Sequence, residues 1–320
     1  MRKRFIAVRE DQPGSAWLAR FIAGRDEAER WYRGRGSSAP PSVAECRTAL
    51  RRHMPELVPH YDRACHMIGD DDLAHRMLSH YRPPPAAFGC THAIWLGEGG
   101  PALLRNYDFP LEIVSPHIES TSWSGREVIA KAQRPWGGCL DGMNEDGLVA
   151  SLAFGGSPAQ GAGFSVILLL RYVLETCRYV DEAVAALSRI PIAASQNVVL
   201  LDRSGSHATL FLGPDRAPAV TRSRACANHQ ETAGTRSSVE RLGIVERALA
   251  DPAATLPDLI SRFLEPLLYS RKTEFTTVYT AVYRPAAGQV DYVWPGKVWP
   301  QTMGRFAPGT YTHDYGDLTP

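Results

Sequence analysis

The 320-residue sequence has almost no excess of charge of either sign. Lysine and arginine total 35 and aspartate and glutamate total 34, which leaves a formal net charge of +1. Without a sequence-wide field, electrostatic attraction to nucleic acid or to an anionic membrane surface is not expected. The expected partner is therefore a small molecule, with no nucleic acid and no membrane partner.

Long apolar runs are also lacking. Residues 5–8 are the only apolar stretch before Arg9, too short for the core of a signal peptide. The longest run, residues 164–170, ends at Arg171 and cannot span a bilayer. These absences predict a cytoplasmic protein.

Cysteine is scarce and shows no metal-binding pattern. The six cysteines include no Cys-x-x-Cys pair and no cysteine–histidine group with zinc spacing, so no metal is expected. A chain with 44% hydrophobic residues can bury a core without disulfides, and most cysteines should be packed, reduced thiols. Residues 97–100 are glycine-rich but join two predicted strands and open no helix. We therefore expect no cofactor.

The first 89 residues have a helical pattern. Apolar residues recur at three- and four-residue spacing over residues 15–32, as on an amphipathic helix. Further helices are predicted over residues 43–53, 55–68 and 71–81. Three prolines at 83–85 end this segment.

From residue 90 onward, short apolar runs alternate with turn signals, which is typical of strands. Strands are predicted over residues 90–96, 102–107, 126–132, 148–154, 196–202, 207–212, 217–221, 224–227, 276–283 and 290–294. Helices are predicted over 164–178, 181–189, 237–250 and 256–264, and an irregular tail over 298–320. Two groups of strands separated by paired helices indicate an α+β fold with two sheets stacked between helical layers.

Cys90 is the candidate nucleophile. It follows Gly89 and opens an apolar strand, and the next strand ends with Arg105 and Asp108. A thiol reacts as thiolate, so it needs a base or a positive neighbour, together with donors for an oxyanion. His92 lies on the same strand face, where its ring would have difficulty reaching the sulfur, so a papain-like pair is not expected.

The main chain offers another base. If the bond between Gly89 and Cys90 is cut, Cys90 gains an α-amine with a pKa of roughly 7.7–8.0. That amine can take the thiol proton directly or through water. Gly89 suits self-cleavage, because a residue without Cβ permits the strained backbone that attack on its carbonyl requires.

Four motifs in this order resemble those of one enzyme family. They are Gly89-Cys90-Thr91, Arg105-Asn106-Tyr107-Asp108, Asp141-Gly142-Met143-Asn144-Glu145-Asp146-Gly147-Leu148 and Ala227-Asn228-His229. The pattern resembles the acyl-coenzyme A:isopenicillin N (6-aminopenicillanic acid) acyltransferase family of N-terminal-nucleophile (Ntn) hydrolases. Choloylglycine hydrolases and penicillin V acylases are more distant relatives. The resemblance extends from about residue 53 to about residue 294.

This resemblance implies a four-layer αββα Ntn-hydrolase sandwich with a helical N-terminal pro-segment. Residues 1–89 would be that pro-segment and residues 90–320 the catalytic domain, separated by self-cleavage. The cleaved fragments are expected to remain associated, and a homo-oligomer is left open. Acyl transfer would pass through a thioester on Cys90, with a small-molecule acyl substrate, an amine acceptor and acyl-CoA as one candidate donor.

Roles for individual residues also follow from the resemblance. Cys90 would be the nucleophile and its α-amine the base. Asp108 would fix that amine or the substrate, and Arg105 would support Asp108 and the thiolate. Asn228 would donate its side-chain amide to the oxyanion. Arg241, which follows a serine-rich turn, would lie near the nucleophile.

One position departs from the relatives. Ala153 stands where bile-salt hydrolases have an asparagine, which favours the acyltransferase branch and leaves a second oxyanion donor unassigned. Residues 141–147 are interpreted as a hairpin turn outside the site. The candidates for lining an acyl pocket are Tyr107, Phe109, Trp123 and Trp136.

Structural interpretations stay open beside these roles. A lone cysteine on an apolar strand is usually a small buried hydrophobe, and Arg105 with Asp108 would be an ordinary strand-end ion pair. Asn228 would cap its own turn, and Arg241 would be solvated.

The leading functional hypothesis is an autoproteolytic cysteine acyltransferase or amidohydrolase. It would move an acyl group from an amide or acyl thioester to an amine or water. The alternatives are a hydrolase of N-acyl amino acids or peptides without transferase activity, and an uncleaved, catalytically silent protein that binds a small ligand.

Overall fold

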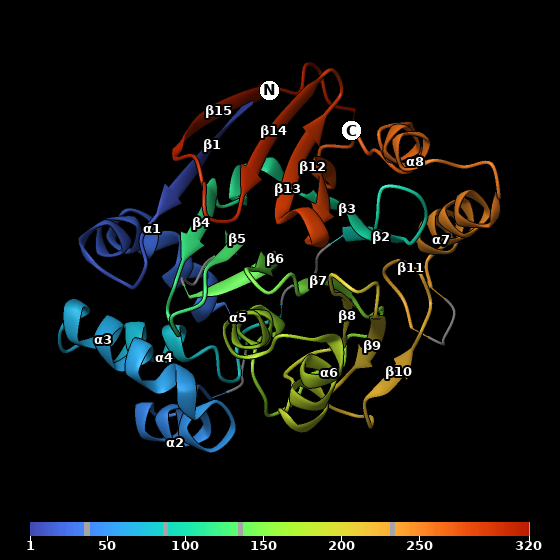
Figure 1. The fold of residues 1–320 in the computed structure, drawn as a ribbon. Helices are drawn as coiled ribbons and strands as arrows, with labels where there is room; N and C mark the ends of the chain where they lie inside the picture. The colour runs from blue at the N-terminus through green and yellow to red at the C-terminus, as the bar shows by residue number, and fades with distance from the viewer. Residues whose placement is uncertain (35–38, 86–88, 134–136, 231–233, 320) are drawn as a thin grey trace.

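The computed structural model of the chain describes residues 1–34, 39–85, 89–133, 137–230 and 234–319. Two β-sheets lie face to face, and helices cover the outer face of each (Figure 1). The expected αββα sandwich is confirmed.

The larger sheet has nine strands in the order β10-β9-β8-β7-β6-β5-β4-β1-β15. Its members are β1 (Arg2–Arg9), β4 (His117–Thr121), β5 (Val128–Gln133), β6 (Gly138–Asn144), β7 (Val149–Phe154), β8 (Gln196–Leu201), β9 (His207–Leu212), β10 (Ala219–Thr221) and β15 (Gly309–Asp314). The smaller sheet has six strands in the order β11-β2-β3-β12-β13-β14. They are β2 (Gly89–Trp95), β3 (Ala102–Phe109), β11 (Ala225–Cys226), β12 (Thr276–Arg284), β13 (Gln289–Trp294) and β14 (Lys297–Thr302).

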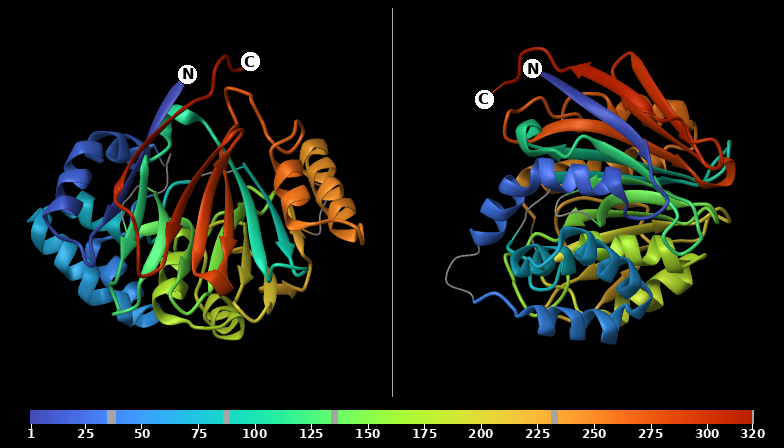
Figure 2. Two further views of the ribbon diagram at one scale, coloured as in Figure 1. Left: turned by 45° about the horizontal axis from the view of Figure 1, so that its top comes forward. Right: turned by 90° about the vertical axis from the view of Figure 1, so that its left-hand side faces the viewer.

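The helices form three groups. On the nine-stranded sheet lie α5 (Val166–Thr176) and α6 (Val180–Arg189), and on the six-stranded sheet lie α7 (Arg236–Ala250) and α8 (Leu256–Phe263). The third group is α1 (Ser15–Arg33), α2 (Val43–His53), α3 (Val58–Ile68) and α4 (Asp72–Ser79), at one side of the sandwich (Figure 2). Single 3-10 turns occur at Pro55–Leu57, Leu111–Ile113 and Pro285–Ala287.

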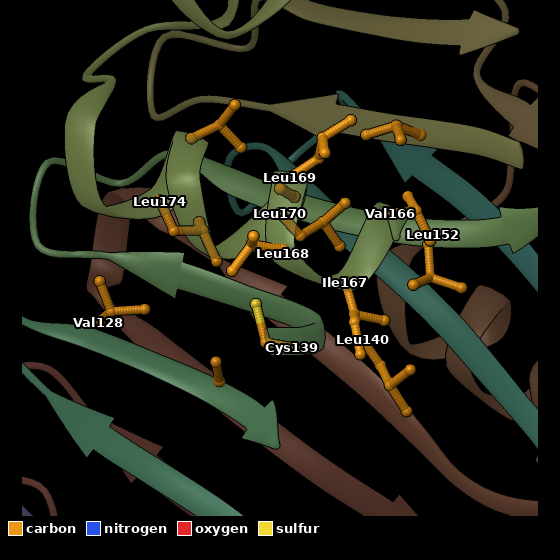
Figure 3. Packing of buried hydrophobic residues seen from close by; sticks show 14 of the residues in the cluster. Val128, Cys139, Leu140, Leu152, Val166, Ile167, Leu168, Leu169, Leu170 and Leu174 are labelled. Carbon is orange, nitrogen blue, oxygen red and sulfur yellow. The ribbon is translucent and has the colours of Figure 1, made fainter. Parts of the chain in front are cut away.

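Helix α5 is the centre of the larger core. Its residues from Val166 to Glu175 are all buried, and the helix packs against β6 and β7, which carry Cys139, Leu140 and Leu152 (Figure 3). Gly142 permits this close approach, because a Cβ there would lie 2.8 Å from Leu174 Cδ1. Each fully buried leucine contributes about 1.5–3 kcal/mol of burial free energy, so this layer anchors the strands that carry the site.

Two predictions about the chain ends are wrong. The first segment begins with a strand, β1. Its Phe5 and Ala7 side chains are both buried, and the Phe5 ring packs on the Trp294 ring at a centroid distance of 5.3 Å. Because β1 pairs with β4 and β15, the segment before Cys90 contributes one strand to the larger sheet. Residues 298–320 include most of β14 and all of β15, where an irregular tail was predicted.

The turn predicted over residues 141–147 is displaced. Residues 138–144 form β6, and the turn lies after it. All seven residues of β6 are buried, because α5 covers one face and the six-stranded sheet the other. A strand buried on both faces lacks the polar–apolar alternation that marks a half-exposed strand, which explains why the pattern was missed.

Candidate active site

The strand pair β2–β3 positions the predicted site residues on two opposite faces. Cys90 lies opposite Tyr107, His92 opposite Arg105, and Gly89 opposite Asp108. Directly opposed residues of a pleated sheet share a face. Cys90 and Arg105 therefore face the nine-stranded sheet, whereas Asp108 faces the helix layer.

On the inner face, Arg105 bridges the thiol and a carboxylate. Its Nη2 donates to Cys90 Sγ at 3.0 Å, and its Nη1 donates to Asp141 of β6. Asp141 also accepts hydrogen bonds from the hydroxyls of Tyr283, at 2.5 Å, and Tyr279, at 3.2 Å. Arg105, Asp141 and Cys90 are all fully buried. The guanidinium is thus held rigidly against the sulfur.

Burial and charge act in opposite directions on the thiol. Burial raises the pKa of Cys90, while the positive charge and the hydrogen bond of Arg105 lower it in part. The pKa of Arg105 also reflects opposing effects: burial lowers it, but the nearby Cys90 and Asp141 raise it well above its usual value. Arg105 is therefore a permanent cation, and the thiol of the uncut chain still needs a proton acceptor.

His92 does not serve as that acceptor in this geometry. Its Nε2 lies 2.7 Å from the hydroxyl of Ser151, on the facing sheet. Burial, followed by the charge of Arg105, lowers the pKa of His92 well below its usual value. A neutral imidazole bonded to a serine fits the expectation that no papain-like pair forms.

On the outer face, Asp108 pairs with Arg241. The Arg241 guanidinium donates to Asp108 Oδ2, and the Thr277 hydroxyl donates to Oδ1 at 2.6 Å. Burial raises the pKa of Asp108, and Arg241 opposes that rise. The sequence predicted Arg105 as the support of Asp108, but the carboxylate partner of Arg105 is Asp141. Arg105 and Asp108 are three positions apart on one strand, and an odd spacing sends their side chains to opposite faces.

Asn228 contacts the nucleophile directly. Its Oδ1 accepts the backbone N–H of Cys90 at 2.9 Å, and its own backbone N–H lies 2.8 Å from Ser238 Oγ. The surrounding turn is held by Asn197, whose Nδ2 donates to the carbonyls of Ala227 and His229 at 3.0 Å each. The side-chain amide predicted to act on an oxyanion is therefore adjacent to Cys90.

A cavity of about 340 Å³ lies at the end of β3, and its lining does not include Cys90. Phe109 is part of its wall, and Tyr107, opposite Cys90 in the sheet, stacks on Phe109 with centroids 5.8 Å apart. Of the aromatic candidates, Trp123 lies elsewhere: it stacks on His60 of α3, 5.3 Å away, and lines a separate small cavity. Trp136 lies outside the described residues.

The sequence analysis missed two kinds of site residue. Asp141 carried a usable signal, because a carboxylate inside the apolar run from Cys139 to Met143 needs a buried cation. Thr277, Tyr279 and Tyr283 of β12 carried no such signal, because threonine and tyrosine are common in any strand.

The part of the chain that the structure describes contains no cluster of metal-ligating side chains and no membrane-length apolar helix. No group of three or more potential ligand residues lies close enough to hold a metal ion there. No helix among the described residues is long and apolar enough to cross a bilayer. The six cysteines, all among the described residues, form no disulfide, and all but Cys65 are buried.

Comparison with known families identifies a relationship for most of the chain. Residues 95–299 match the family model of acyl-coenzyme A:6-aminopenicillanic acid acyl-transferase. The chain belongs to this family. The match begins after Cys90, so the matched residues do not include the Gly89–Cys90 junction. No curated protein matches the chain in sequence.

Several solved structures are distantly similar to this family member. A mutant conjugated bile acid hydrolase from Clostridium perfringens has 12% identity and a TM-score of 0.49, over 71% of this chain and 97% of that chain. Penicillin V acylase from Agrobacterium tumefaciens has 17% identity and a TM-score of 0.46, over 67% and 86%. An N-acylethanolamine-hydrolyzing acid amidase ortholog from Caenorhabditis elegans has 14% identity and a TM-score of 0.44, over 72% and 100%. The family assignment rests on the sequence match alone.

Proposed function

We propose that this protein is a self-processing cysteine acyltransferase or amidohydrolase with Cys90 as its N-terminal nucleophile. The observation that carries the proposal is the contact between Arg105 and Cys90 Sγ at 3.0 Å, next to an Asn228 side chain bonded to the Cys90 nitrogen. A buried cation beside a thiol stabilises the thiolate, and a fixed amide nearby can stabilise an oxyanion.

Self-cleavage is the first proposed reaction. Cys90 Sγ attacks the carbonyl carbon of Gly89, the peptide C–N bond breaks, and the acyl group moves from nitrogen to sulfur. Water then hydrolyses this thioester, which leaves a carboxylate on Gly89 and a free α-amine on Cys90. Asp108 lies opposite Gly89, and a Cβ at Gly89 would come within 3.0 Å of Asp108 Cβ, so glycine suits this crowded junction.

The mature site would then use the new amine as its base. Because Asn228 Oδ1 already accepts from the Cys90 nitrogen, the same contact can orient the α-amine after cleavage. The amine takes the thiol proton, and Sγ attacks the substrate carbonyl. The oxyanion is stabilised by Asn228 Nδ2, and the α-ammonium protonates the leaving group. An amine or water finally attacks the thioester and releases the acyl product.

Several parts of this proposal concern partners. The acyl donor is an amide or a thioester such as acyl-CoA, and the acceptor is an amine or water. No cofactor is required, because the thiol and the amine supply the chemistry. The cytoplasmic location, the association of the cleaved fragments and a homo-oligomer remain predictions.

Intact-mass analysis of the purified protein tests cleavage. We expect two fragments, split between Gly89 and Cys90, whose masses sum to that of the chain plus one water. Cys90→Ala should remain uncut and inactive, whereas Cys65→Ser, which changes a partly exposed thiol in α3, should be cut normally. An uncut wild-type chain with full activity would rule out the α-amine as the base.

Amine competition separates transferase from hydrolase. If millimolar amine traps the acyl group as a new amide, the protein transfers it; if only the free acid appears, the protein is a hydrolase. A Cys90 that reacts with an acylating probe no faster than the other thiols would favour the silent ligand-binding alternative.

A further inference from the structure

We propose that the 340 Å³ cavity at the end of β3 binds an acyl group that carries an amide within its chain, and not a plain alkyl chain. This inference rests on the proposed role of Cys90 as the acylated nucleophile.

The walls are mostly apolar. They come from α1, from the prolines before β2, from the end of β3, from the start of α5 and from the segment before β8. The apolar lining residues are Ala28, Trp31, Pro83, Pro84, Phe109, Ile113, Val166, Ile167, Ala193 and Ala194. A cavity of this size and composition suits a small acyl group of several carbon atoms.

Six polar or charged residues also line the cavity, and of these only two glutamines are buried; the other four, at partly or fully exposed positions, are Glu27, Arg30, Gln160 and Ser165. Gln133 ends β5 and Gln196 opens β8, and their exposed fractions are 8% and 3%. Both line the cavity, and the side-chain oxygen of each lacks a hydrogen-bond partner among the described residues. An unsatisfied buried acceptor costs about 1–3 kcal/mol, so these oxygens favour a ligand that brings a donor.

The chemistry of glutamine points to an amide as that donor. A glutamine side chain accepts through its oxygen and donates through its nitrogen. A secondary amide presents the complementary N–H and C=O, whereas an alkyl chain presents neither. An alkyl chain would leave both glutamine oxygens buried without partners.

Two contact paths connect the cavity with Cys90. On one side, Phe109 stacks on Tyr107, which lies opposite Cys90 in the sheet. On the other side, Gln196 precedes Asn197, whose amide holds the turn that carries Asn228 against the Cys90 nitrogen. With its carbonyl at Sγ, the proposed acyl chain would have to extend past Tyr107 and Phe109 to reach this cavity.

Two substrates of equal length test the proposal by turnover. They are heptanoyl p-nitroanilide and N-butanoylglycyl p-nitroanilide, in which an amide replaces two methylene groups. We expect the wild-type enzyme to prefer the butanoylglycyl substrate by about tenfold in kcat/KM, since each satisfied hydrogen bond adds only a modest net free energy. Gln133→Leu and Gln196→Leu should each reduce this ratio severalfold.

The control is Gln12→Leu, which makes the same change at an exposed position outside the cavity and should leave the ratio unaltered. Gln133→Met and Gln196→Met replace any leucine variant that does not fold. A wild-type preference for the heptanoyl substrate, or a ratio unaffected by the buried variants, would overturn the inference.

Binding to Cys90→Ala separates this inference from the proposed function. By calorimetry, N-butanoylglycinamide should bind about tenfold more tightly than heptanamide, and the buried glutamine variants should remove the difference. If this preference holds but the wild-type protein turns over neither substrate, the proposed function fails and the cavity assignment stands. If turnover occurs without any binding preference, the proposed function stands and the cavity assignment fails.

Discussion

The two faces of the strand pair β2–β3 each carry an ion pair, in different surroundings. On the inner face, Arg105 and Asp141 are fully buried between the sheets, together with the thiol and two tyrosine hydroxyls. On the outer face, Asp108 pairs with Arg241 beneath α7, where the Arg241 side chain keeps 12% of its exposure. The inner pair acts on the sulfur, and the outer pair lies beside the peptide bond before it.

This difference indicates that the two ion pairs have different roles. A cation locked between sheets has little freedom to move, so its charge acts continuously on Cys90. The outer pair lies at the edge between sheet and helix, opposite Gly89, where the chain would separate on cleavage. We therefore expect inner-face changes to alter thiol reactivity and outer-face changes to alter processing.

The largest effect is expected for Arg105→Met. It removes the positive neighbour of the thiol and leaves Asp141 buried without its cation, so the free energy of unfolding should fall by about 3–5 kcal/mol. The rate of Cys90 alkylation by iodoacetamide at pH 7.5 should fall at least about tenfold, because the pKa of the thiol rises further. Urea unfolding and the alkylation rate as a function of pH measure both effects.

Arg284→Met is the matched control. Arg284 pairs with Asp291 in the same sheet, but its side chain is 28% exposed and lies away from Cys90. The free energy of unfolding of Arg284→Met should fall by about 1 kcal/mol or less, and the alkylation rate of Cys90 should be unchanged. Equal losses of reactivity in both variants would contradict a specific role for Arg105.

A smaller and more selective effect is expected for Asp108→Asn. The change removes the carboxylate opposite Gly89 but leaves Arg105 and Asp141 in place. Appearance of the cleaved fragments after in vitro translation should slow by about 10–100-fold, in the range of a lost positioning group. Alkylation of Cys90 in the uncut chain should change less than about threefold. If alkylation and cleavage fall together, the two faces do not act separately.

The smallest effect is the pH dependence contributed by His92. Its pKa is held well below the usual value in the folded protein, so the unfolded chain binds the extra proton as pH falls below about 6.5. Folding is then favoured above that pH and weakened below it, by up to about 1.4 kcal/mol per pH unit for this one group. His92→Gln should make the decline in unfolding free energy between pH 7 and 5 shallower.

His313 offers a comparison, because burial lowers its pKa as well but it is only half-buried. His313→Gln should change the slope less than His92→Gln does. A larger change for His313 would show that the inner face does not dominate this pH dependence.

Much of the fold was predictable from local patterns. The expected helices of the first segment occur within a few residues of their predicted bounds. The strand that contains Cys90 and the strand after it, β2 and β3, also lie close to their predicted bounds. The prediction failed where a strand is buried on both faces, as in β6, where a strand is short, as in the five-residue β4, and at the eight-residue β1. In these places local alternation is weak, and pairing with distant strands decides the conformation.

The candidate site divides in the same way. The sequence alone determined that a glycine–cysteine pair opens a strand and that an arginine and an aspartate end the next one, because period-two alternation and motif order are local properties. Only the tertiary structure decided that Arg105 pairs with Asp141, 36 residues away, and Asp108 with Arg241, 133 residues away. Partners so distant in the chain meet through the stacking of two sheets and the docking of a helix, and local periodicity carries no information about either.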